Sequence, residues 1–340
     1  MSDAEFDTLL KRVAAGDRLA IDESSRAFGL IMTGTVSDVR IAAFVTALAV
    51  RKPSIDEIVG AVRAMRSAMT AIEANPYAID LCGTGGDGAG TLNISTACAF
   101  VVSSCGVPVA KHGNRNMSSK SGTADCLEAL GVKIELGPAD AARCLREAGL
   151  CFLFAQTYHP AMKYAARVRQ TLGFRTIFNL LGPLSNPARV RRQLVGVYDR
   201  EWVELLAETL ARLGSDRVWV VHGDGLDEIA ISGPTRVAML SDGKIAVREI
   251  GPEDAGLSWS PLSALAGGTA TENAMALKRL LDGETGAYRD IVLINSAAAL
   301  VIAGKAGNLK EGVAQAASAI DNGSARAKLD KLVAVSNAST

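Results

Sequence analysis

The sequence has few aromatic residues, and this scarcity limits how its core can be built. Phe, Tyr and Trp make up only 5% of the 340 residues, whereas apolar residues as a whole make up 49%. The core must therefore be filled mainly by Ala, Leu, Val and Ile. A chain of this length still buries about three quarters of the surface exposed when unfolded, which is enough for two domains.

The chain also lacks an excess of charge of either sign. It contains 36 Lys and Arg residues against 36 Asp and Glu residues. A neutral chain has no overall field that attracts nucleic acid or an anionic membrane, so we expect neither as a partner. Any site for an anion must then be a local cluster of basic and hydroxyl side chains.

Long hydrophobic runs and a leader pattern are missing as well. The first residues are acidic, unlike a signal peptide. The longest apolar run, 291–303, is shorter than the roughly 20 residues that span a bilayer, and it predicts a buried helix. The six cysteines form no CxxC pair and lie mostly in apolar segments. Such thiols behave as small hydrophobic residues, which predicts a reducing compartment, the cytoplasm.

The apolar pattern changes along the chain. Between 6 and 73 its period is helical and predicts four helices. After Asn75-Pro76, short apolar runs alternate with helical stretches, which predicts an α/β layer with mainly parallel strands. The stretch 159–187 interrupts this alternation, and the chain is helical again from 272. The predicted strands are 78–82, 107–111, 151–155, 193–198 and 218–223.

A glycine-rich loop follows the first predicted strand. Five glycines lie between 83 and 90, and Asn93, Ser95 and Thr96 follow at a predicted helix start. Glycines let backbone N–H groups approach an anion, and a helix N-terminus favours phosphate. The loop matches neither a dinucleotide fingerprint nor a Walker A motif. Its position after a strand favours a phosphate site over a plain turn.

A basic loop follows the second predicted strand. Residues 111–123, KHGNRNMSSKSGT, combine three cations with four hydroxyl side chains. Cations supply charge and hydroxyls supply neutral donors, a composition typical of a phosphate or pyrophosphate cradle. The alternative is a solvated surface loop, which would not need the Gly-Asn and Ser-Gly turns.

Adjacent carboxylates, Asp227 and Glu228, follow the fifth predicted strand. Their oxygens suit Mg²⁺, which is often shared with substrate phosphates. Alone, the pair reads as an acidic surface turn, but beside two phosphate-type loops it predicts a magnesium site. The three histidines lack zinc spacing. For His159, a structural role is at least as plausible as a role in the site.

Together these motifs resemble the anthranilate phosphoribosyltransferase family. Any one motif is weakly specific, but four in the family's order are highly specific, and the resemblance extends to about Gly304. Small departures at Asn116-Met117 and Arg167 affect no main role. The motifs are CGTGGDG with TLNIST, KHGNRNMSSKSGTAD, YHPAMKYAARVRQTLGFRTIFNLLGPLSNPA, and GDGLDE.

The resemblance implies both a fold and a reaction. It implies an N-terminal all-helical domain joined by hinges to a larger α/β domain with a central, mainly parallel sheet, as in nucleoside phosphorylases and phosphoribosyltransferases. The helical domain would be 1–74 with a returning segment around 160–187, and the α/β domain 75–159 and 188–340. A homodimeric pentosyltransferase using Mg²⁺ would transfer the phosphoribosyl group of phosphoribosyl pyrophosphate to the amine of anthranilate, in tryptophan biosynthesis.

The resemblance also implies roles for individual residues. Lys111, His112 and Asn114 would be catalytic, stabilising the departing pyrophosphate by electrostatics. Gly83, Asn114 and Arg169 would contact anthranilate. Ser95, Asp227 and Glu228 would hold magnesium. The donor would be bound by Gly83, Gly86, Asp87, Thr91, Asn93, Ile94, Ser95, Thr96, Lys111, His112, Gly113, Asn114, Arg115, Asn116, Met117, Ser118, Ser119 and Thr123.

Two alternatives to the transferase share this architecture. A nucleoside phosphorylase-like enzyme would consume phosphate and carry base-reading residues in place of Asn114 and Arg169. A non-catalytic, nucleic-acid-binding relative would show a basic surplus and lose its metal residues. The neutral charge and the intact Asp227-Glu228 pair argue against this second alternative.

Apolar residues of the predicted N-terminal helices also suggest an interface. Phe44, Leu48, Ile58 and Val62 are among positions that exceed what a four-helix layer needs to bury internally. The sequence therefore predicts that these helices form a symmetric dimer.

Overall fold

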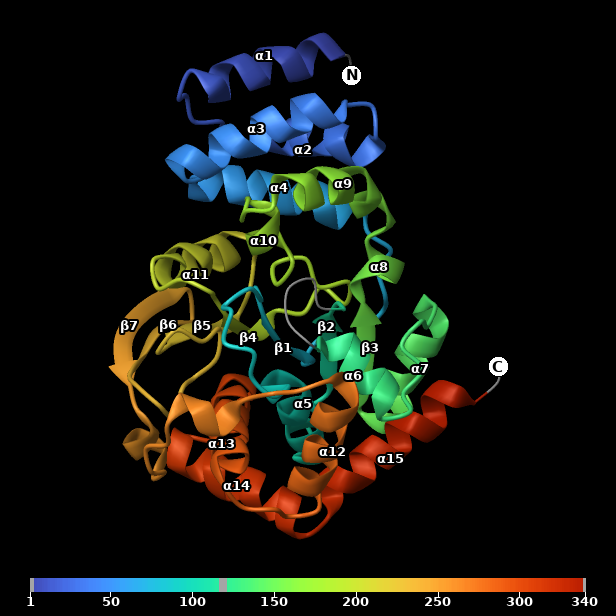
Figure 1. Ribbon diagram of the computed structural model, residues 1–340, viewed down its shortest axis with the longest axis vertical. Coiled ribbons are helices and arrows are strands. Elements are labelled where there is room, and N and C mark those ends of the chain that lie inside the picture. Colours follow the sequence, from blue (N-terminus) through green and yellow to red (C-terminus); the bar gives the residue numbers. More distant parts are fainter. Residues whose placement is uncertain (1–2, 116–120, 339–340) are drawn as a thin grey trace.

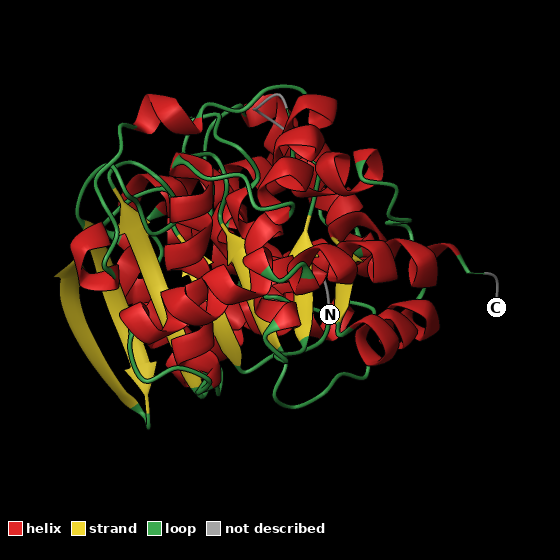
Figure 2. Cartoon of the chain, turned by 90° about the horizontal axis from the view of Figure 1, so that it is seen from below, coloured by secondary structure: helices red, strands yellow, loops and turns green. Residues whose placement is uncertain are grey.

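The computed structural model describes residues 3–115 and 121–338. A layer of helices at the N-terminal end lies over a sheet that has helices on both faces (Figures 1 and 2). Four predicted donor-binding residues, Asn116, Met117, Ser118 and Ser119, lie outside the described residues.

The N-terminal layer contains the four predicted helices. A fifth helix, α9 (Lys163–Leu172), belongs to the returning segment and packs against the second and third of them (Figure 1). The rings of Phe6 and Phe28 lie 5.3 and 5.7 Å from that of Phe44, so aromatic contacts join three helices. The four helices are α1 (Asp3–Ala14), α2 (Ile21–Thr33), α3 (Asp38–Arg51) and α4 (Ile55–Ala68).

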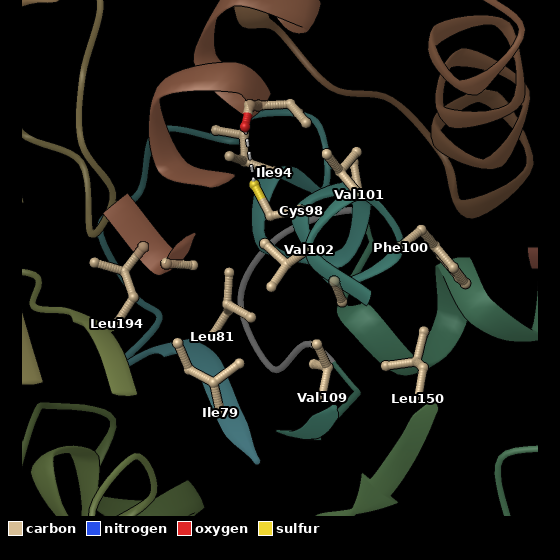
Figure 3. Close-up of a cluster of buried hydrophobic side chains, with 14 of the residues drawn as sticks. Ile79, Leu81, Ile94, Cys98, Phe100, Val101, Val102, Val109, Leu150 and Leu194 are labelled. Carbon is tan, nitrogen blue, oxygen red and sulfur yellow. Dashed lines mark hydrogen bonds between the residues drawn. The ribbon is translucent and has the colours of Figure 1, made fainter. Parts of the chain in front are cut away.

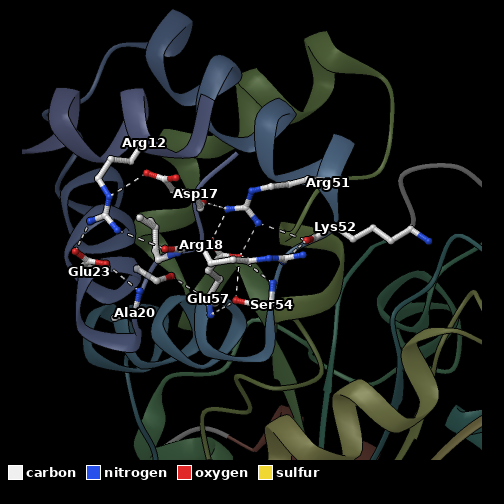
Figure 4. Close-up of polar contacts among 11 residues, drawn as sticks. Arg12, Asp17, Arg18, Ala20, Glu23, Arg51, Lys52, Ser54 and Glu57 are labelled. Atoms are coloured by element: carbon white, nitrogen blue, oxygen red, sulfur yellow. Dashed lines mark hydrogen bonds and ion pairs between the residues drawn. The ribbon is translucent and has the colours of Figure 1, made fainter. Parts of the chain in front are cut away.

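A buried carboxylate, Glu57, ties the turns of this layer together (Figure 4). It accepts hydrogen bonds from the backbone N–H groups of Leu19 (2.9 Å) and Ser54 (2.8 Å) and from the guanidinium of Arg51 (2.9 Å). Burial alone would raise the pKa of Glu57, but these hydrogen bonds bring it below its usual value. This buried hydrogen-bond network therefore has a structural role.

The prediction that the N-terminal helices have surplus apolar surface for a dimer is wrong. Phe44, Leu48, Ile58 and Val62 are 0% exposed within the single chain, so they are not surplus apolar surface. They belong to a core that also contains residues of the returning segment, such as Phe178, and one face of the sheet. The dimer itself stays a prediction.

The sheet has seven strands in the order β3-β2-β1-β4-β5-β6-β7. The first five in this order are parallel, as predicted, and the last two are antiparallel. The strands are β1 (Ile79–Gly83), β2 (Val109–Gly113), β3 (Leu150–Phe154), β4 (Arg192–Gly196), β5 (Arg217–Gly223), β6 (Thr235–Ser241) and β7 (Lys244–Ile250).

Sequence reasoning missed the hairpin formed by β6 and β7. Its turn consists of Asp242 and Gly243, which both have positive φ angles (52° and 72°). An Asp-Gly pair between two short runs is a strong hairpin signal and could have revealed it. The exposed β7, in which three charged residues interrupt the apolar ones, hid the pattern, because only its last residue is buried.

Helices cover both faces of the sheet. On one face, Cys98 and Val102 of α5 (Ile94–Ser104) lie over Ile79 and Leu81 of β1 (Figure 3). On the other face, α11 (Trp202–Arg212) packs against β5 and β6, α4 packs against α11, and α10 (Phe178–Leu181) packs against α4. The remaining α-helices are α6 (Thr123–Ala129), α7 (Pro138–Ala148), α8 (Ala155–Tyr158), α12 (Ala270–Leu281), α13 (Ala287–Ala303), α14 (Leu309–Asp321) and α15 (Ser324–Asn337).

This arrangement brings the predicted loops to one edge of the sheet. The parallel strands β1, β2 and β5 end at this edge, and the glycine, basic and acidic loops begin there.

The predicted domain boundaries and hinges stay predictions. All six cysteines are free. Within the described ranges, no helix has the length and apolar character needed to cross a membrane.

Candidate active site

The glycine loop after β1 is fixed at its beginning and open further along. The N–H of Thr84 donates to the carbonyl of Gly196 (3.0 Å), and the N–H of Gly85 donates to Oδ2 of Asp227 (2.7 Å). Within the described part of the chain, the N–H groups of Gly86, Asp87 and Gly88 make no hydrogen bond. These donors are free to bind an anion.

Two glycines at strand ends make room for Asp227. A Cβ atom at Gly83 would lie 2.2 Å from Oδ2 of Asp227, and one at Gly196 would lie 1.5 Å from its backbone oxygen. Neither approach is possible for a real side chain, so Asp227 depends on both glycines. Gly83, a predicted substrate residue, thus also has a structural reason to be glycine.

Asp227 and Glu228 lie in a crowded acidic environment. Burial and the nearby Asp87 raise the pKa of Asp227, and burial and Asp227 raise the pKa of Glu228. The charge of Lys111 opposes the shift at Glu228. Neighbouring carboxylates that resist ionisation are stabilised by a bound cation.

The side-chain oxygens of this site fit magnesium if substrate phosphates supply the remaining ligands. The backbone N–H of Ser95 lowers the pKa of Glu228, so the hydroxyl-bearing residue lies beside the carboxylates. Nowhere among the described residues, this site included, do three or more His, Cys, Asp or Glu side chains form a group that could hold a metal ion. Two carboxylates and a hydroxyl suit Mg²⁺, because this ion keeps waters and takes phosphate oxygens as further ligands.

Asn295 of α13 fixes the loop that carries Asp227 and Glu228. Sequence reasoning missed this residue. This fully buried side chain accepts a hydrogen bond from the N–H of Ile229 and donates one to its carbonyl, both at 2.9 Å. It also donates to the carbonyl of Ile291 (2.9 Å). These bonds fix the backbone directly after Glu228.

Lys111, in β2, is only 2% exposed. Its amino group donates hydrogen bonds to the carbonyl of Leu81 (2.6 Å) and to Oγ of Ser95 (3.0 Å). Its charge therefore acts here on Ser95 and on the nearby carboxylates. The predicted contact between Lys111 and the donor stays a prediction.

Asp80 is a second residue that sequence reasoning missed. It is fully buried and accepts hydrogen bonds from the N–H of His112 (3.1 Å) and from Nδ2 of Asn186 (2.7 Å). Burial raises the pKa of Asp80, against the opposing charge of Lys111. Asp80 fixes the start of the basic loop, and an aspartate inside an apolar strand was the signal for it.

A cavity of about 910 Å³ lies between the strand ends and the helical layer. This volume is large enough for two small substrates. All three predicted anthranilate residues line it. Its walls include Gly83, His112, Gly113, Asn114 and Arg115 from the α/β side, and Met65, His159, Arg169 and Phe178 from the opposite side.

Arg169 is a half-buried cation on the cavity wall. Its guanidinium carbon lies 6.0 Å from the ring centroid of Phe178, and burial lowers its pKa. No carboxylate of the described residues forms an ion pair with it. By contrast, the exposed Arg167 pairs with Asp38 at 3.6 Å. Of these two arginines, Arg169 is the one available to a ligand carboxylate.

Two histidines, one from each side of the cavity, face each other. The rings of His112 and His159 lie 5.1 Å apart, and neither Nε2 atom has a partner among the described residues. Burial and the neighbouring ring lower the pKa of His112 to about 3, and burial lowers that of His159 to about 4. Both are therefore neutral at physiological pH, and the structure places His159 at the cavity.

We expect these histidines to make the fold sensitive to acid. Their folded pKa values lie below the unfolded value of about 6.5, so the unfolded chain binds more protons below that pH. Stability is therefore lost as the pH falls from about 6.5 towards 4, by about 2 kcal/mol per histidine at pH 5. Urea unfolding at pH 7.5 and pH 5 measures this loss. His112→Gln/His159→Gln should lose clearly less, and an equal loss would contradict neutral burial.

Other predicted donor residues are placed less directly. Ile94 and Thr96 are buried (2% and 1% exposed) and are not among the described residues that line the cavity. The hydroxyl of Thr96 lies 3.4 Å from that of Thr123. Arg115 pairs with Asp125 and Glu128 of α6, so its charge is committed to that helix.

The N-terminus of α5 is held by the C-terminal helices. The side-chain oxygen of Asn93 accepts a hydrogen bond from Asn273 (3.0 Å), and its carbonyl accepts one from the hydroxyl of Tyr288 (3.1 Å). Thr91 pairs with Ala266 in an isolated β-bridge. These contacts place the helix start beside the glycine loop.

Comparison with known proteins agrees with this geometry. Residues 75–326 match the profile of the "Glycosyl transferase family, a/b domain", and residues 7–69 match the "Glycosyl transferase family, helical bundle domain". An anthranilate phosphoribosyltransferase from Rhodopseudomonas palustris is 55% identical over 335 residues, which cover 98% of this chain and 99% of that protein. The chain belongs to the anthranilate phosphoribosyltransferase family.

Solved structures of anthranilate phosphoribosyltransferases are similar over nearly the whole chain. The Thermus thermophilus protein has a TM-score of 0.93 at 43% identity, with 97% of this chain and 99% of that chain covered. A Saccharomyces cerevisiae protein in complex with PRPP and Mg has a TM-score of 0.90 at 28% identity, with 98% of each chain covered. The predicted fold class, a helical bundle and a larger α/β domain, is confirmed.

Proposed function

We propose that the cavity is the active site in which the chain transfers a phosphoribosyl group from phosphoribosyl pyrophosphate to the amine of anthranilate, with release of pyrophosphate. One observation carries this proposal. Among the described residues, glycine-loop N–H groups without a hydrogen bond, paired carboxylates beside Gly83 and an arginine without an ion pair lie around the same strand ends. The first two suit a metal-bound diphosphate, and the third suits the carboxylate of the acceptor.

Magnesium would be held by Ser95, Asp227 and Glu228. When bound, Mg²⁺ supplies positive charge that balances the phosphate oxygens of the donor. The raised pKa values of both carboxyls support this placement, because a cation relieves their repulsion. Lys111 orients the hydroxyl of Ser95 from behind.

The remaining residues bind and orient the donor. The N–H groups of Gly86, Asp87 and Gly88 and the N-terminus of α5 would bind the phosphates. Negative charge grows on pyrophosphate as its bond to ribose breaks, so these fixed donors favour the transition state. The aniline amine is neutral and attacks without prior deprotonation, so no strong base is required.

The acceptor would lie between the two walls of the cavity. Arg169 would bind its carboxylate, while Gly83 and Asn114 would contact it from the strand side. A Saccharomyces cerevisiae relative, 27% identical with a TM-score of 0.88, has been solved in complex with 4-fluoroanthranilate. This supports a small aromatic carboxylate as acceptor.

The activity is tested by mixing purified protein, Mg²⁺, phosphoribosyl pyrophosphate and anthranilate. We expect anthranilate fluorescence to fall only when both donor and metal are present. Assays with nucleosides and inorganic phosphate test the phosphorylase alternative and should show no base release. Persistent fluorescence in the complete mixture would contradict the proposal.

We also propose that the enzyme is a cytoplasmic homodimer with the domain boundaries given above. The family resemblance supports the dimer, and six free cysteines support a reducing compartment. Sedimentation at micromolar concentration tests the assembly. A monomer there would overturn it.

A further inference from the structure

The segment between α9 and α10 reaches the glycine loop through one side chain, Arg175. Its Nη2 atom donates a hydrogen bond to the carbonyl of Gly86. Its guanidinium carbon lies 4.2 Å from the ring centroid of Tyr198. The planar guanidinium thus stacks on the face of the Tyr198 ring, while its edge donates the hydrogen bond to the glycine loop.

Tyr198 supports the loop a second time. Its backbone N–H donates a hydrogen bond to Oγ1 of Thr84 (3.0 Å), at the base of the same loop. On the opposite side, Oδ2 of Asp227 accepts from the N–H of Gly85 (2.7 Å). The loop is therefore held between a metal-type carboxylate and the pair formed by Arg175 and Tyr198.

The contact from Arg175 determines the direction of one peptide group. The described chain has no cis peptide bonds, and in a trans peptide the C=O and the following N–H point in opposite directions. Because the carbonyl of Gly86 points to Arg175, the N–H of Asp87 points away from it. Gly86 has a φ of 75°, a conformation that glycine adopts and leaves easily, so the peptide needs a partner to stay in place.

We propose that Arg175 is a positioning residue that holds the Asp87 N–H ready for the phosphates of the donor. It acts through the backbone of the glycine loop, on an N–H group that makes no hydrogen bond within the described residues. Arg175 belongs to the returning segment, which also carries Arg169, so the glycine loop is held from the acceptor side of the cavity. This inference depends on the proposed placement of the donor.

Calorimetric binding of phosphoribosyl pyrophosphate with Mg²⁺, without acceptor, tests the role independently of turnover. Loss of a hydrogen bond from a charged group predicts about tenfold weaker binding for Arg175→Ala, with an unchanged melting temperature. Arg175→Lys should recover only part of this loss, because an ammonium cannot lie flat on the ring and reach the carbonyl together. In turnover, the donor KM should rise about tenfold while the anthranilate KM changes little.

Three further variants sharpen the test. Tyr198→Phe keeps the ring face and should bind as the wild type does, whereas Tyr198→Leu removes it and should reproduce part of the Arg175→Ala loss. Arg167→Ala is the matched control, because this exposed arginine of the returning segment forms its ion pair with Asp38, away from the glycine loop. It should leave donor binding unchanged.

Several outcomes would overturn the inference. Wild-type donor affinity in Arg175→Ala or in Arg175→Lys would show that the planar contact is not needed. An equal loss in Arg167→Ala would show that only the local charge matters. These results leave the proposed function intact, whereas failure of the wild-type protein to bind the donor would overturn both.

Discussion

Asp227→Asn/Glu228→Gln is expected to abolish turnover at ordinary Mg²⁺ concentration while leaving the protein folded. The amides keep the shape of both side chains but remove the charge that balances a cation. With several kcal/mol of electrostatic stabilisation lost, kcat/KM should fall by a factor on the order of a thousand or more. The fluorescence assay measures the loss, and circular dichroism reports the fold.

The same double variant should be more stable than the wild type in the absence of metal. The folded pKa values of both carboxyls are raised above their unfolded values, so ionisation costs stability as the pH rises through them. Urea unfolding at pH 8 without metal should show a higher unfolding free energy for the amides. Asp224→Asn is the matched control, because this exposed carboxylate of the same turn accepts a hydrogen bond from the hydroxyl of Ser232 (2.8 Å).

Near-normal turnover of the double variant would place the magnesium elsewhere. Equal inactivation by Asp224→Asn would show that the turn matters as a whole and that the two carboxylates have no special role. If the double variant loses activity but gains stability without metal, the two carboxylates are present to bind the cation. A purely structural pair would instead lose stability when altered.

The convergence of the three loops could be predicted because it depends on local patterns and one topological rule. Parallel strands end at the same edge, so loops after 82, 111 and 223 had to meet. The residues that support these loops could not be predicted in this way. Asn295 meets Ile229 from a helix far along the chain, and Asn186 meets Asp80 across the fold. No local period in the sequence indicates such partners.

The apolar surface of the N-terminal helices was misjudged for a related reason. Counting apolar positions assumes that the helices pack only against one another. In the structure, the returning segment also packs into this layer, and the ring of Phe178 lies 5.7 Å from that of Phe28. The stretch that interrupts the α/β pattern thus shares one hydrophobic core with residues such as Phe44 and Ile58.

Arg169→Ala is expected to raise the anthranilate KM about ten- to hundredfold and to leave the donor KM nearly unchanged. Arg169 lines the cavity, is half-buried and forms no ion pair within the described residues. Losing a charged hydrogen-bond partner costs about 1.5–3 kcal/mol, which corresponds to that range of affinity. Steady-state kinetics with each substrate varied in turn measures both constants.

Two companion variants distinguish a carboxylate site from a general effect of charge. Arg169→Lys should restore the anthranilate KM only partly, because an ammonium cannot donate two parallel hydrogen bonds to one carboxylate. Arg167→Ala should change neither constant, since Arg167 points to Asp38 at the surface. An equal rise in both KM values for Arg169→Ala, or an effect confined to Arg167→Ala, would contradict the assignment. Because the two arginines share one helix turn and differ in burial, only the side chain that faces the cavity should affect the acceptor.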